Sequence, residues 1–170
     1  MRTRKAQTLS PDFTISFVIF LMIIVMGIKL WDIASEKELW IDDIDDLQKK
    51  ARTTADILIL TPGMPEGWDN ETVVFLGLAE EDHVLNKTKL LYFRNLSYER
   101  ARALMRIGAN DFKLNMKYKN GSVLVMDGEN MTYGKEYANA DNVVHSERLT
   151  LVNDSGNLFI AKLDLILWRD

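Results

Sequence analysis

Few side chains in this sequence have the types and spacing that catalysis or metal binding requires. There is no cysteine, so thiolate chemistry, disulfides and cysteine-ligated metals are excluded. The two histidines, His83 and His145, lie far apart, and neither has a second histidine at ligand spacing. The segment 127–130 lacks the full spacing of a calcium loop, and we find no glycine-rich phosphate loop and no Gly-x-Ser-x-Gly motif. We therefore expect no enzyme activity, no cofactor and no metal site.

Asparagine is the residue that carries clear modification chemistry. Six of the eleven asparagines stand in Asn-x-Ser/Thr, the acceptor pattern for N-linked glycans, and none has proline in the middle position. Such an excess predicts a glycosylated surface outside the cytoplasm. The alternative is that these asparagines bond to local backbone in turns. The glycosylation candidates are Asn70, Asn86, Asn95, Asn120, Asn130 and Asn153.

An apolar run near the beginning of the chain predicts where the protein resides. Residues 13–28 carry no charge, and the run reaches Trp31 if Lys29 extends its amine to the interface. As a helix this length is roughly 28 Å, close to the hydrocarbon thickness of about 30 Å. Cations precede the run and carboxylates follow it. The positive-inside rule then places the N-terminus in the cytoplasm and the rest of the chain outside, anchored in the cell membrane by one helix.

Three other interpretations of this run are open. A removable signal peptide has the same basic start and apolar core, but its nearest cleavage site would end at Ala34, with Asp32 two residues before it. An uncleaved anchor needs nothing beyond the run itself. A buried core helix is disfavoured, because an uninterrupted apolar run of this length is rare in a soluble domain of this size.

Residues just before the run carry a resemblance to a known family. Lys5-Ala6-Gln7, followed by Ser10-Pro11-Asp12-Phe13 and the apolar helix, resembles the class III signal sequence of archaeal type IV pilin-like proteins. The resemblance implies that a prepilin peptidase recognises Lys5, Ala6 and Gln7 and cuts after Ala6. Cleavage after Gln7 would instead make Asp12 the fifth mature residue, where that family carries its carboxylate. The resemblance also implies assembly with other pilin-like subunits through the retained helix, at Asp12, Phe13, Phe17 and Phe20.

A physical argument for Asp12 is independent of that family. A carboxylate at the N-terminus of a helix is favoured by the helix dipole. In a packed assembly it would also meet the new α-amino group of a neighbouring subunit, and the pair would fix the stagger between subunits. The simpler alternative is that Asp12 only caps the helix, with Ser10 as a second possible cap and Pro11 in the first turn. The two roles do not exclude each other.

The helix is expected to continue beyond the apolar run, over about residues 10–59. No proline or glycine lies between Trp31 and Leu60, and Thr61-Pro62-Gly63 then ends the helix. Apolar positions step by four and three along a narrow seam, which predicts packing against a head domain. A separate coiled-coil stalk is the alternative, but fewer than four heptads are available. The seam consists of Trp40, Ile44, Leu47, Ala51, Thr54 and Leu58.

The rest of the chain predicts an α+β head, in which the N-terminal helix packs on an antiparallel sheet of four or more strands. Asn120-Gly121 predicts a tight hairpin turn between alternating segments. Ser97 is expected to cap a helix that ends near Gly108. The expected strands are 73–76, 111–118, 122–126, 143–152 and 158–168, with a helix at 98–107 and a loop at 127–141.

These elements predict a leader at 1–6, a long helix at 7–59 with a transmembrane segment at 13–31, and an extracytoplasmic head at 60–170. Blocks within residues 58–112 also resemble archaeal membrane-anchored pilin-like proteins. The resemblance implies a structural subunit of a surface filament that serves adhesion or surface interaction. The alternative is a monomeric anchored domain that binds a ligand or another envelope protein. The net charge of −4 argues against nucleic acid as a partner.

Overall fold

The computed structural model describes residues 11–138, 140 and 142–169, and the side chains of residues 36–42 lie outside that description. The leader and the predicted cleavage residues Lys5, Ala6 and Gln7 are therefore outside the described part of the chain. The chain forms two compact units that divide between Asp43 and Ile44. From here on we call the second unit, Ile44–Asp170, the head, so that it includes the last part of the long helix as well as the predicted head domain.

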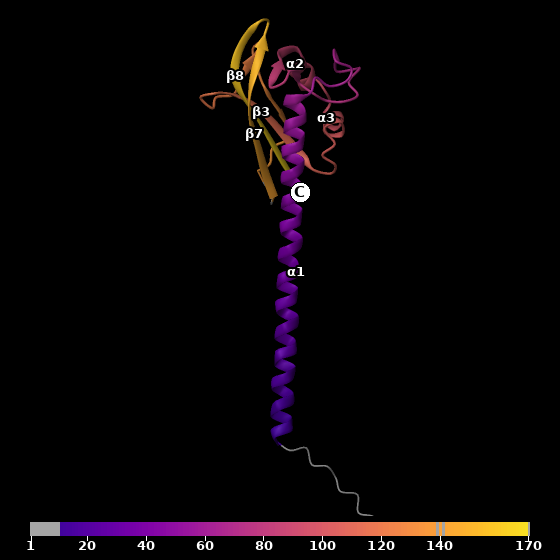
Figure 1. The fold of residues 1–170 in the computed structure, drawn as a ribbon, viewed down its shortest axis with the longest axis vertical. Coiled ribbons are helices and arrows are strands. Elements are labelled where there is room, and N and C mark those ends of the chain that lie inside the picture. Colours follow the sequence, from indigo (N-terminus) through magenta and orange to yellow (C-terminus); the bar gives the residue numbers. More distant parts are fainter. Residues whose placement is uncertain (1–10, 139, 141, 170) are drawn as a thin grey trace, which may run out of the picture. The chain divides into compact units, whose positions relative to one another are not determined.

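One α-helix, α1, runs from Pro11 to Leu60 and contributes residues to both units (Figure 1). This confirms the long helix expected from the sequence. Proline at the first position is tolerated because the first-turn N–H groups have no partner within the helix. At the other end, the backbone N–H and the hydroxyl of Thr61 both donate to the carbonyl of Ile57, at 3.1 and 2.8 Å. Pro62 cannot donate the next helical hydrogen bond, so the helix ends there.

The part of α1 that belongs to the head buries one side in its core. Four members of the predicted seam are buried: Leu47, Ala51, Thr54 and Leu58. Ile44 is half-buried, and the side chain of Trp40 is outside the described residues. Ala55 and Ile59 are buried as well and widen the seam into a face.

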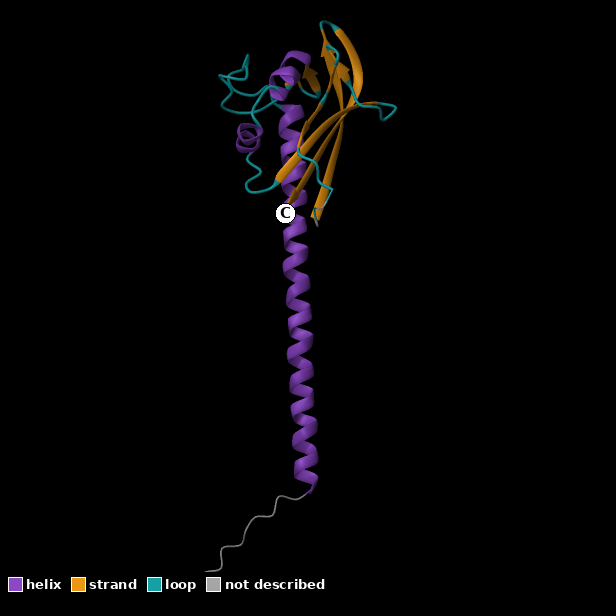
Figure 2. Cartoon of the chain, turned by 180° about the vertical axis from the view of Figure 1, so that it is seen from behind, coloured by secondary structure: helices purple, strands orange, loops and turns teal. Residues whose placement is uncertain are grey.

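The head contains a six-stranded sheet in the order β1-β2-β7-β8-β3-β6. Figures 1 and 2 show the strands beside the last part of α1. The centre of the sheet is a long hairpin of two strands, which confirms the two predicted C-terminal strands. The expectation of a purely antiparallel sheet is wrong, because β2 pairs with β7 in parallel. The strands are β1 (Ala79–Glu81), β2 (Val84–Asn86), β3 (Asp111–Tyr118), β6 (Thr132–Gly134), β7 (Asn142–Asp154) and β8 (Asn157–Arg169).

Alternate side chains on one face of this sheet form the core of the head with α1. The inward residues of β3 and β8 are nearly all fully buried, as the alternation predicted. Phe112 contacts the rings of Phe93 and Tyr133, with centroids 6.5 and 5.9 Å away. The inward residues are Phe112, Leu114, Met116, Ala161, Leu163, Leu165 and Leu167.

Two short helices connect β2 to β3. The sequence analysis did not predict α2 (Lys87–Arg94), which Asn86 caps by accepting from the backbone N–H groups of Thr88 and Lys89. The second helix, α3 (Tyr98–Met105), ends earlier than predicted, because Arg106 adopts a left-handed conformation with φ of 54°. Ser97 is the N-cap residue of α3, as predicted, but its side chain makes no capping hydrogen bond.

Two strand predictions are corrected. Residues 73–76 form only one β-bridge, between Phe75 and Met64, and are otherwise a loop. The predicted hairpin at Asn120-Gly121 forms its turn, but pairs with β3 only briefly. The chain then turns away, so that β6 takes the same edge of β3. The predicted loop at 127–141 also contains β5 (Glu129–Asn130), paired with β4 (Val125–Met126).

Candidate functional site

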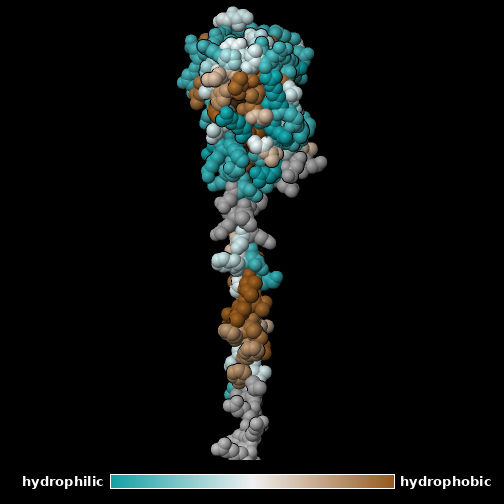
Figure 3. All heavy atoms as spheres, turned by 90° about the vertical axis from the view of Figure 1, so that its right-hand side faces the viewer, coloured by the Kyte–Doolittle hydropathy of each residue, from teal (hydrophilic) through white to brown (hydrophobic). Residues whose placement is uncertain are grey.

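The anchor segment, Pro11–Ser35, is long and apolar enough to cross a membrane. Its 25 residues correspond to a helix of about 37 Å, longer than the hydrocarbon layer of about 30 Å. None of its most apolar stretch is buried among the residues that the structure describes. Figure 3 shows hydrophobic side chains along this part of the helix on the face turned toward the viewer. The segment therefore needs lipid or other apolar helices around it.

The predicted assembly residues lie at the beginning of this segment. Asp12 is in the first turn of α1, where a carboxylate is favoured by the helix dipole. Phe13, Phe17 and Phe20 are spaced at i, i+4 and i+7, so they share one face, and each is at least half exposed. The rings of Phe13 and Phe17 stack at 6.3 Å. The structure thus places these four residues together at one end of the anchor segment.

The six predicted glycosylation sites all belong to the head, and they divide into two groups. Four asparagines are exposed: Asn70, Asn95, Asn120 and Asn130. Asn86 and Asn153 are half-buried, and the side-chain nitrogen of each donates to the same carboxylate oxygen of Glu80, at 3.3 and 3.0 Å. A glycan attaches through this nitrogen, so the folded head offers the first group more freely than the second.

One concave feature of the head is a largely apolar groove whose lining includes three cations. Its volume is about 310 Å³, at the lower end of small-ligand sites. Three cations line it, and no acidic residue does. The guanidinium of Arg106 lies 5.9 Å from the centre of the Phe75 ring in its wall. The lining residues are Lys49, Lys50, Thr53, Thr54, Ile57 and Leu58 of α1, Phe75 and Leu76, and Leu104, Met105 and Arg106.

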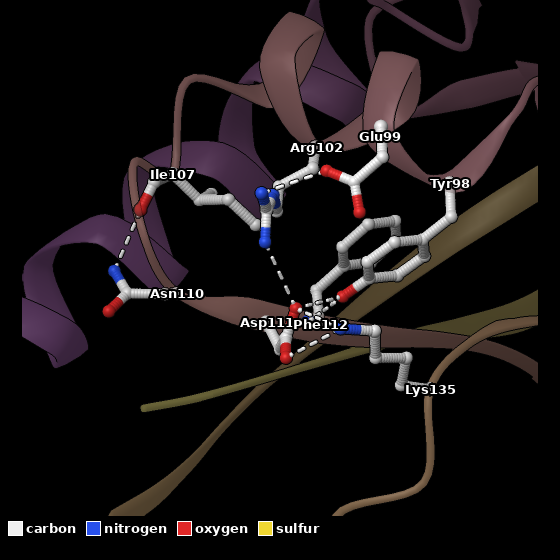
Figure 4. A network of polar contacts seen from close by, with 8 residues as sticks. All are labelled: Tyr98, Glu99, Arg102, Ile107, Asn110, Asp111, Phe112 and Lys135. Carbon is white, nitrogen blue, oxygen red and sulfur yellow. Dashed lines mark hydrogen bonds and ion pairs between the residues drawn. The ribbon is translucent and has the colours of Figure 1, made fainter. Parts of the chain in front are cut away.

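A polar network fastens α3 to the start of β3 (Figure 4). The Tyr98 hydroxyl donates to Asp111 Oδ1 at 2.7 Å and accepts from the backbone N–H of Phe112 at 3.0 Å. Lys135 Nζ lies 3.0 and 2.9 Å from the two Asp111 oxygens, and Arg102 adds a contact at 3.3 Å. The Tyr98 ring also stacks on Phe112 with centroids 4.9 Å apart. Every polar group of this cluster has a partner inside the head, which indicates a structural role.

The electrostatics of the network follow from its burial and its cations. Burial raises the pKa of Asp111, but the hydrogen bonds from Tyr98 and Lys135 outweigh it and hold this pKa below its ordinary value. Burial, together with the hydrogen bond to Asp111, raises the pKa of Tyr98. The carboxylate therefore stays ionised and the phenol stays protonated at neutral pH, and neither has the poised pKa that acid–base catalysis requires.

Each of the two histidines lies beside one carboxylate. His83 Nδ1 lies 2.8 Å from Asp82, and His145 Nδ1 lies 3.5 Å from the buried carboxylate of Asp164, which also binds Lys117 at 2.7 Å. Among the described residues, no group of three histidine, aspartate or glutamate side chains is arranged to hold a metal ion.

The groove and one buried lysine were not predicted from the sequence. Lys89 is only 8 % exposed, and its amine donates to the carbonyls of Pro62 and Ala79, each at 2.8 Å. Burial lowers its pKa. Trp68 donates to the same Pro62 carbonyl, so the two side chains hold the loop after α1 in place. Lys89 belongs to α2, and the spacing of Leu90 and Phe93 on one helix face was the signal in the sequence that could have predicted this helix.

Searches of protein-family models, of curated proteins and of solved structures returned no match to this chain. The function must therefore be inferred from the anchor segment, the groove and the surface of the head.

Proposed function

We propose that the protein is a structural subunit, a pilin or minor pilin-like protein, of an archaeal type IV pilus-like surface filament. In this proposal a prepilin peptidase cuts the chain near Ala6–Gln7 on the cytoplasmic side of the membrane. The anchor segments of many copies then pack together, and the heads face the exterior. The filament serves adhesion or surface interaction, and the subunit performs no catalysis and needs no cofactor.

The observation that supports this function best is the unburied anchor segment at the start of α1. An apolar helix with no cover inside its own chain is stable in lipid or against other apolar helices. The aligned rings of Phe13, Phe17 and Phe20 provide a face for such packing. Asp12 stands beside them, where a free α-amino group of a neighbour would neutralise its charge in an apolar surrounding.

The test is the intact mass and N-terminal sequence of the membrane-extracted protein after removal of glycans. A chain that begins at Gln7 or Thr8 and retains the anchor segment is the expected result. A chain that begins at Met1 would favour a simple anchored domain. A chain that begins beyond Trp31 would mean a secreted domain and would refute the proposal.

Assembly itself is tested by substitution at the anchor. Asp12→Ala is expected to leave the membrane-extracted amount unchanged and to abolish recovery of the protein in sheared filament fractions. Asp32→Ala is the matched control, because it removes a carboxylate near the other end of the anchor segment, and normal assembly is expected. Ala6→Arg should leave the chain at full length. Unchanged length and unchanged assembly in the Ala6 and Asp12 variants together would contradict the proposal.

A second candidate function is supported by the groove of the head. A monomeric membrane-anchored domain that binds a ligand would need a concave apolar site, and this groove has one with three cations and no carboxylate in its lining. Its charge suits an amphiphile with an anionic head and a short alkyl chain. In titration calorimetry, decanoate is expected to bind, whereas decyltrimethylammonium is not.

The groove variants separate specific binding from general hydrophobic adsorption. Arg106→Gln should weaken decanoate binding, while Lys119→Gln, which changes an exposed cation outside the groove lining, should not. Equal binding of both amphiphiles, or equal effects of both variants, would exclude this second function.

A further inference from the structure

The six glycosylation motifs differ in how firmly the folded head holds them. A transferase that recognises Asn-x-Ser/Thr must contact both the asparagine and the hydroxyl of the third residue, so it takes the whole tripeptide into its own site. An exposed asparagine is therefore not sufficient. The middle residue of the motif and the backbone beside it must also be able to leave the surface of the head.

The tripeptide Asn120-Gly121-Ser122 lies at the tip of a turn, and all residues from Tyr118 to Val123 are exposed. Local hydrogen bonds close the turn. The Gly121 N–H donates to the Tyr118 carbonyl at 2.9 Å, and the Tyr118 N–H donates to the Ser122 carbonyl at 2.8 Å. A Cβ at Gly121 would meet no atom within 4 Å beyond its chain neighbours, so no other described segment covers the middle of this motif.

The side chain of Asn120 leaves its nitrogen available for reaction. Its Oδ1 accepts from the backbone N–H and from the hydroxyl of Ser122, at 3.0 and 2.7 Å. Neither bond uses Nδ2, the atom to which a glycan attaches. Both bonds also lie within the tripeptide, so a transferase that binds the Ser122 hydroxyl breaks no hydrogen bond to another element of the head.

Two other exposed asparagines stand next to core residues. The middle residue of the Asn95 motif is Leu96, which is only 5 % exposed and whose carbonyl accepts from the Tyr133 hydroxyl at 2.6 Å. The middle residue of the Asn130 motif is Met131, which is 4 % exposed and whose backbone N–H and carbonyl are both hydrogen-bonded, each at 2.8 Å. To present either tripeptide, the head must withdraw an apolar side chain from its core, which is unfavourable.

An arginine holds the motif of Asn70. Its middle residue, Glu71, is exposed, but the Arg100 guanidinium donates to the carbonyls of Asn70 and Glu71, each at 2.7 Å. The hydroxyl of Thr72, which a transferase must bind, donates to Asp69 at 2.8 Å. Contacts with residues outside the motif therefore hold this tripeptide at both ends, although none of its three side chains is buried.

We propose that Asn120 is the site at which an oligosaccharide transferase glycosylates the head after folding, and that the other motifs are accessible to the enzyme only before folding. The donor is a lipid-linked oligosaccharide phosphate. Asn120 Nδ2 forms a bond to the anomeric carbon of the first sugar, the bond from this carbon to the phosphate oxygen breaks, and the lipid phosphate leaves with the electron pair. One proton of Nδ2 passes to a base of the transferase.

The opposing interpretation is that Asn120 only closes the turn through its Oδ1, as asparagine does in many tight turns. In that case the turn keeps the tripeptide out of the enzyme, and no glycan is added after folding. The inference rests on the glycosylation expected from the motifs, and it does not depend on leader cleavage, on Asp12 or on filament assembly. Its failure would therefore leave the proposed filament function unchanged.

The test compares each motif in the folded chain with the same motif in a short peptide. Full-length protein without glycans, folded in detergent, is incubated with a purified transferase and its lipid-linked donor, and peptide mapping by mass spectrometry identifies the sites. The transferase is one that modifies all the isolated peptides, so its sequence preference cancels in the ratio of the folded rate to the peptide rate. This ratio at Asn120 should exceed those at Asn95 and Asn130 by about tenfold or more, as expected for withdrawal of one buried leucine or methionine.

Arg100→Gln tests the restraint on the Asn70 motif. It removes the donors to the carbonyls of Asn70 and Glu71, so the folded rate at Asn70 should rise by about fivefold or more, while the rate at Asn120 stays unchanged. Arg52→Gln is the matched control, because it removes an exposed cation of α1 that makes no hydrogen bond to these carbonyls. Equal rates at Asn70 in the two variants would contradict the role assigned to Arg100.

The expected result is transfer to Asn120 in the folded chain, with a rate ratio above those of the other motifs. A ratio at Asn95 or Asn130 equal to that at Asn120 would overturn the role assigned to the buried middle residues. Modification of the Asn120 peptide without modification of Asn120 in the folded chain would show that this asparagine is only a turn residue, and would overturn the proposal.

Discussion

Replacement of Tyr98 by phenylalanine tests whether the polar network holds the head together. The substitution removes one oxygen and keeps the ring, so the stacking on Phe112 at 4.9 Å can persist. It removes two hydrogen bonds: the one that the Tyr98 hydroxyl donates to Asp111 at 2.7 Å, and the one that it accepts from the backbone N–H of Phe112 at 3.0 Å. The effect therefore reports on hydrogen bonding and not on packing.

The magnitude follows from what each deleted bond leaves behind. The Phe112 residue is fully buried, so its N–H loses the hydroxyl partner at a cost of about 1–3 kcal/mol. Asp111 keeps Lys135 and Arg102, so its loss is smaller, about 1 kcal/mol. Together the two losses should lower the free energy of unfolding by about 2–4 kcal/mol. At roughly 3–4 °C per kcal/mol for a unit of this size, the melting temperature should fall by about 6–16 °C.

The assay is urea unfolding of the full-length protein in detergent, followed by near-ultraviolet circular dichroism. The head contains two fully buried tryptophans, Trp68 and Trp168, whose signal depends on a fixed core. Tyr118→Phe is the matched control, because Tyr118 is 37 % exposed and packs on Phe159 by its ring. That variant should change stability by less than about 0.5 kcal/mol. Equal stability of the Tyr98 variant and the wild type would refute the structural role assigned to the network.

Three further substitutions test the loop after α1 and the charge of the network. Gly77→Ala should cost about 2–4 kcal/mol in urea unfolding, because its Cβ would lie 2.2 Å from the Thr61 carbonyl oxygen; Gly67→Ala, with open space around its Cβ, should be neutral. Asp111→Asn should reduce the loss of stability that the wild type shows as the pH falls. The pKa of Asp111 is lowered in the folded head, so its carboxylate stabilises the head above the pKa of the unfolded chain, and this stabilisation is lost as the pH falls through the pKa of the folded state. Urea midpoints between about pH 3 and 7 measure the difference. Lys89→Met should cost about 1–3 kcal/mol at neutral pH by thermal unfolding, since the carbonyl of Ala79 loses the lysine donor and that of Pro62 keeps only Trp68, and no loss would contradict that role.

The elements that local patterns specify were predictable from the sequence. The seam of α1 followed from the spacing of Leu47, Ala51 and Leu58, and the long hairpin of β7 and β8 followed from alternation. α2 was missed because its first residues, Lys87-Thr88-Lys89, are polar, and the lysine that turns inward is satisfied by carbonyls from other segments. Nothing in the local sequence shows such partners.

Features that depend on distant segments could not be predicted. The parallel pairing of β2 with β7 joins residues 84–86 to residues 151–153, and neither segment contains a signal for the other. The groove combines α1, the Phe75 loop and the end of α3, including Arg106 in its left-handed conformation. The predicted residues Phe13, Phe17 and Phe20 do share one helix face, because helical spacing alone determines that arrangement, and Asp12 lies in the first turn before them.

If Asn86 or Asn153 carries a glycan, the contact of both side chains with Glu80 implies that attachment precedes folding of this part of the head. Both amide nitrogens bind one carboxylate oxygen in the folded head, at the place where β2 meets β7. A transferase would reach either nitrogen only before this part of the sheet closes. A sugar attached there would remove a donor from Glu80 and hinder the closure. The fraction of chains with a glycan at these two sites would therefore depend on the time between synthesis and folding, whereas the fraction at the exposed Asn120 would not.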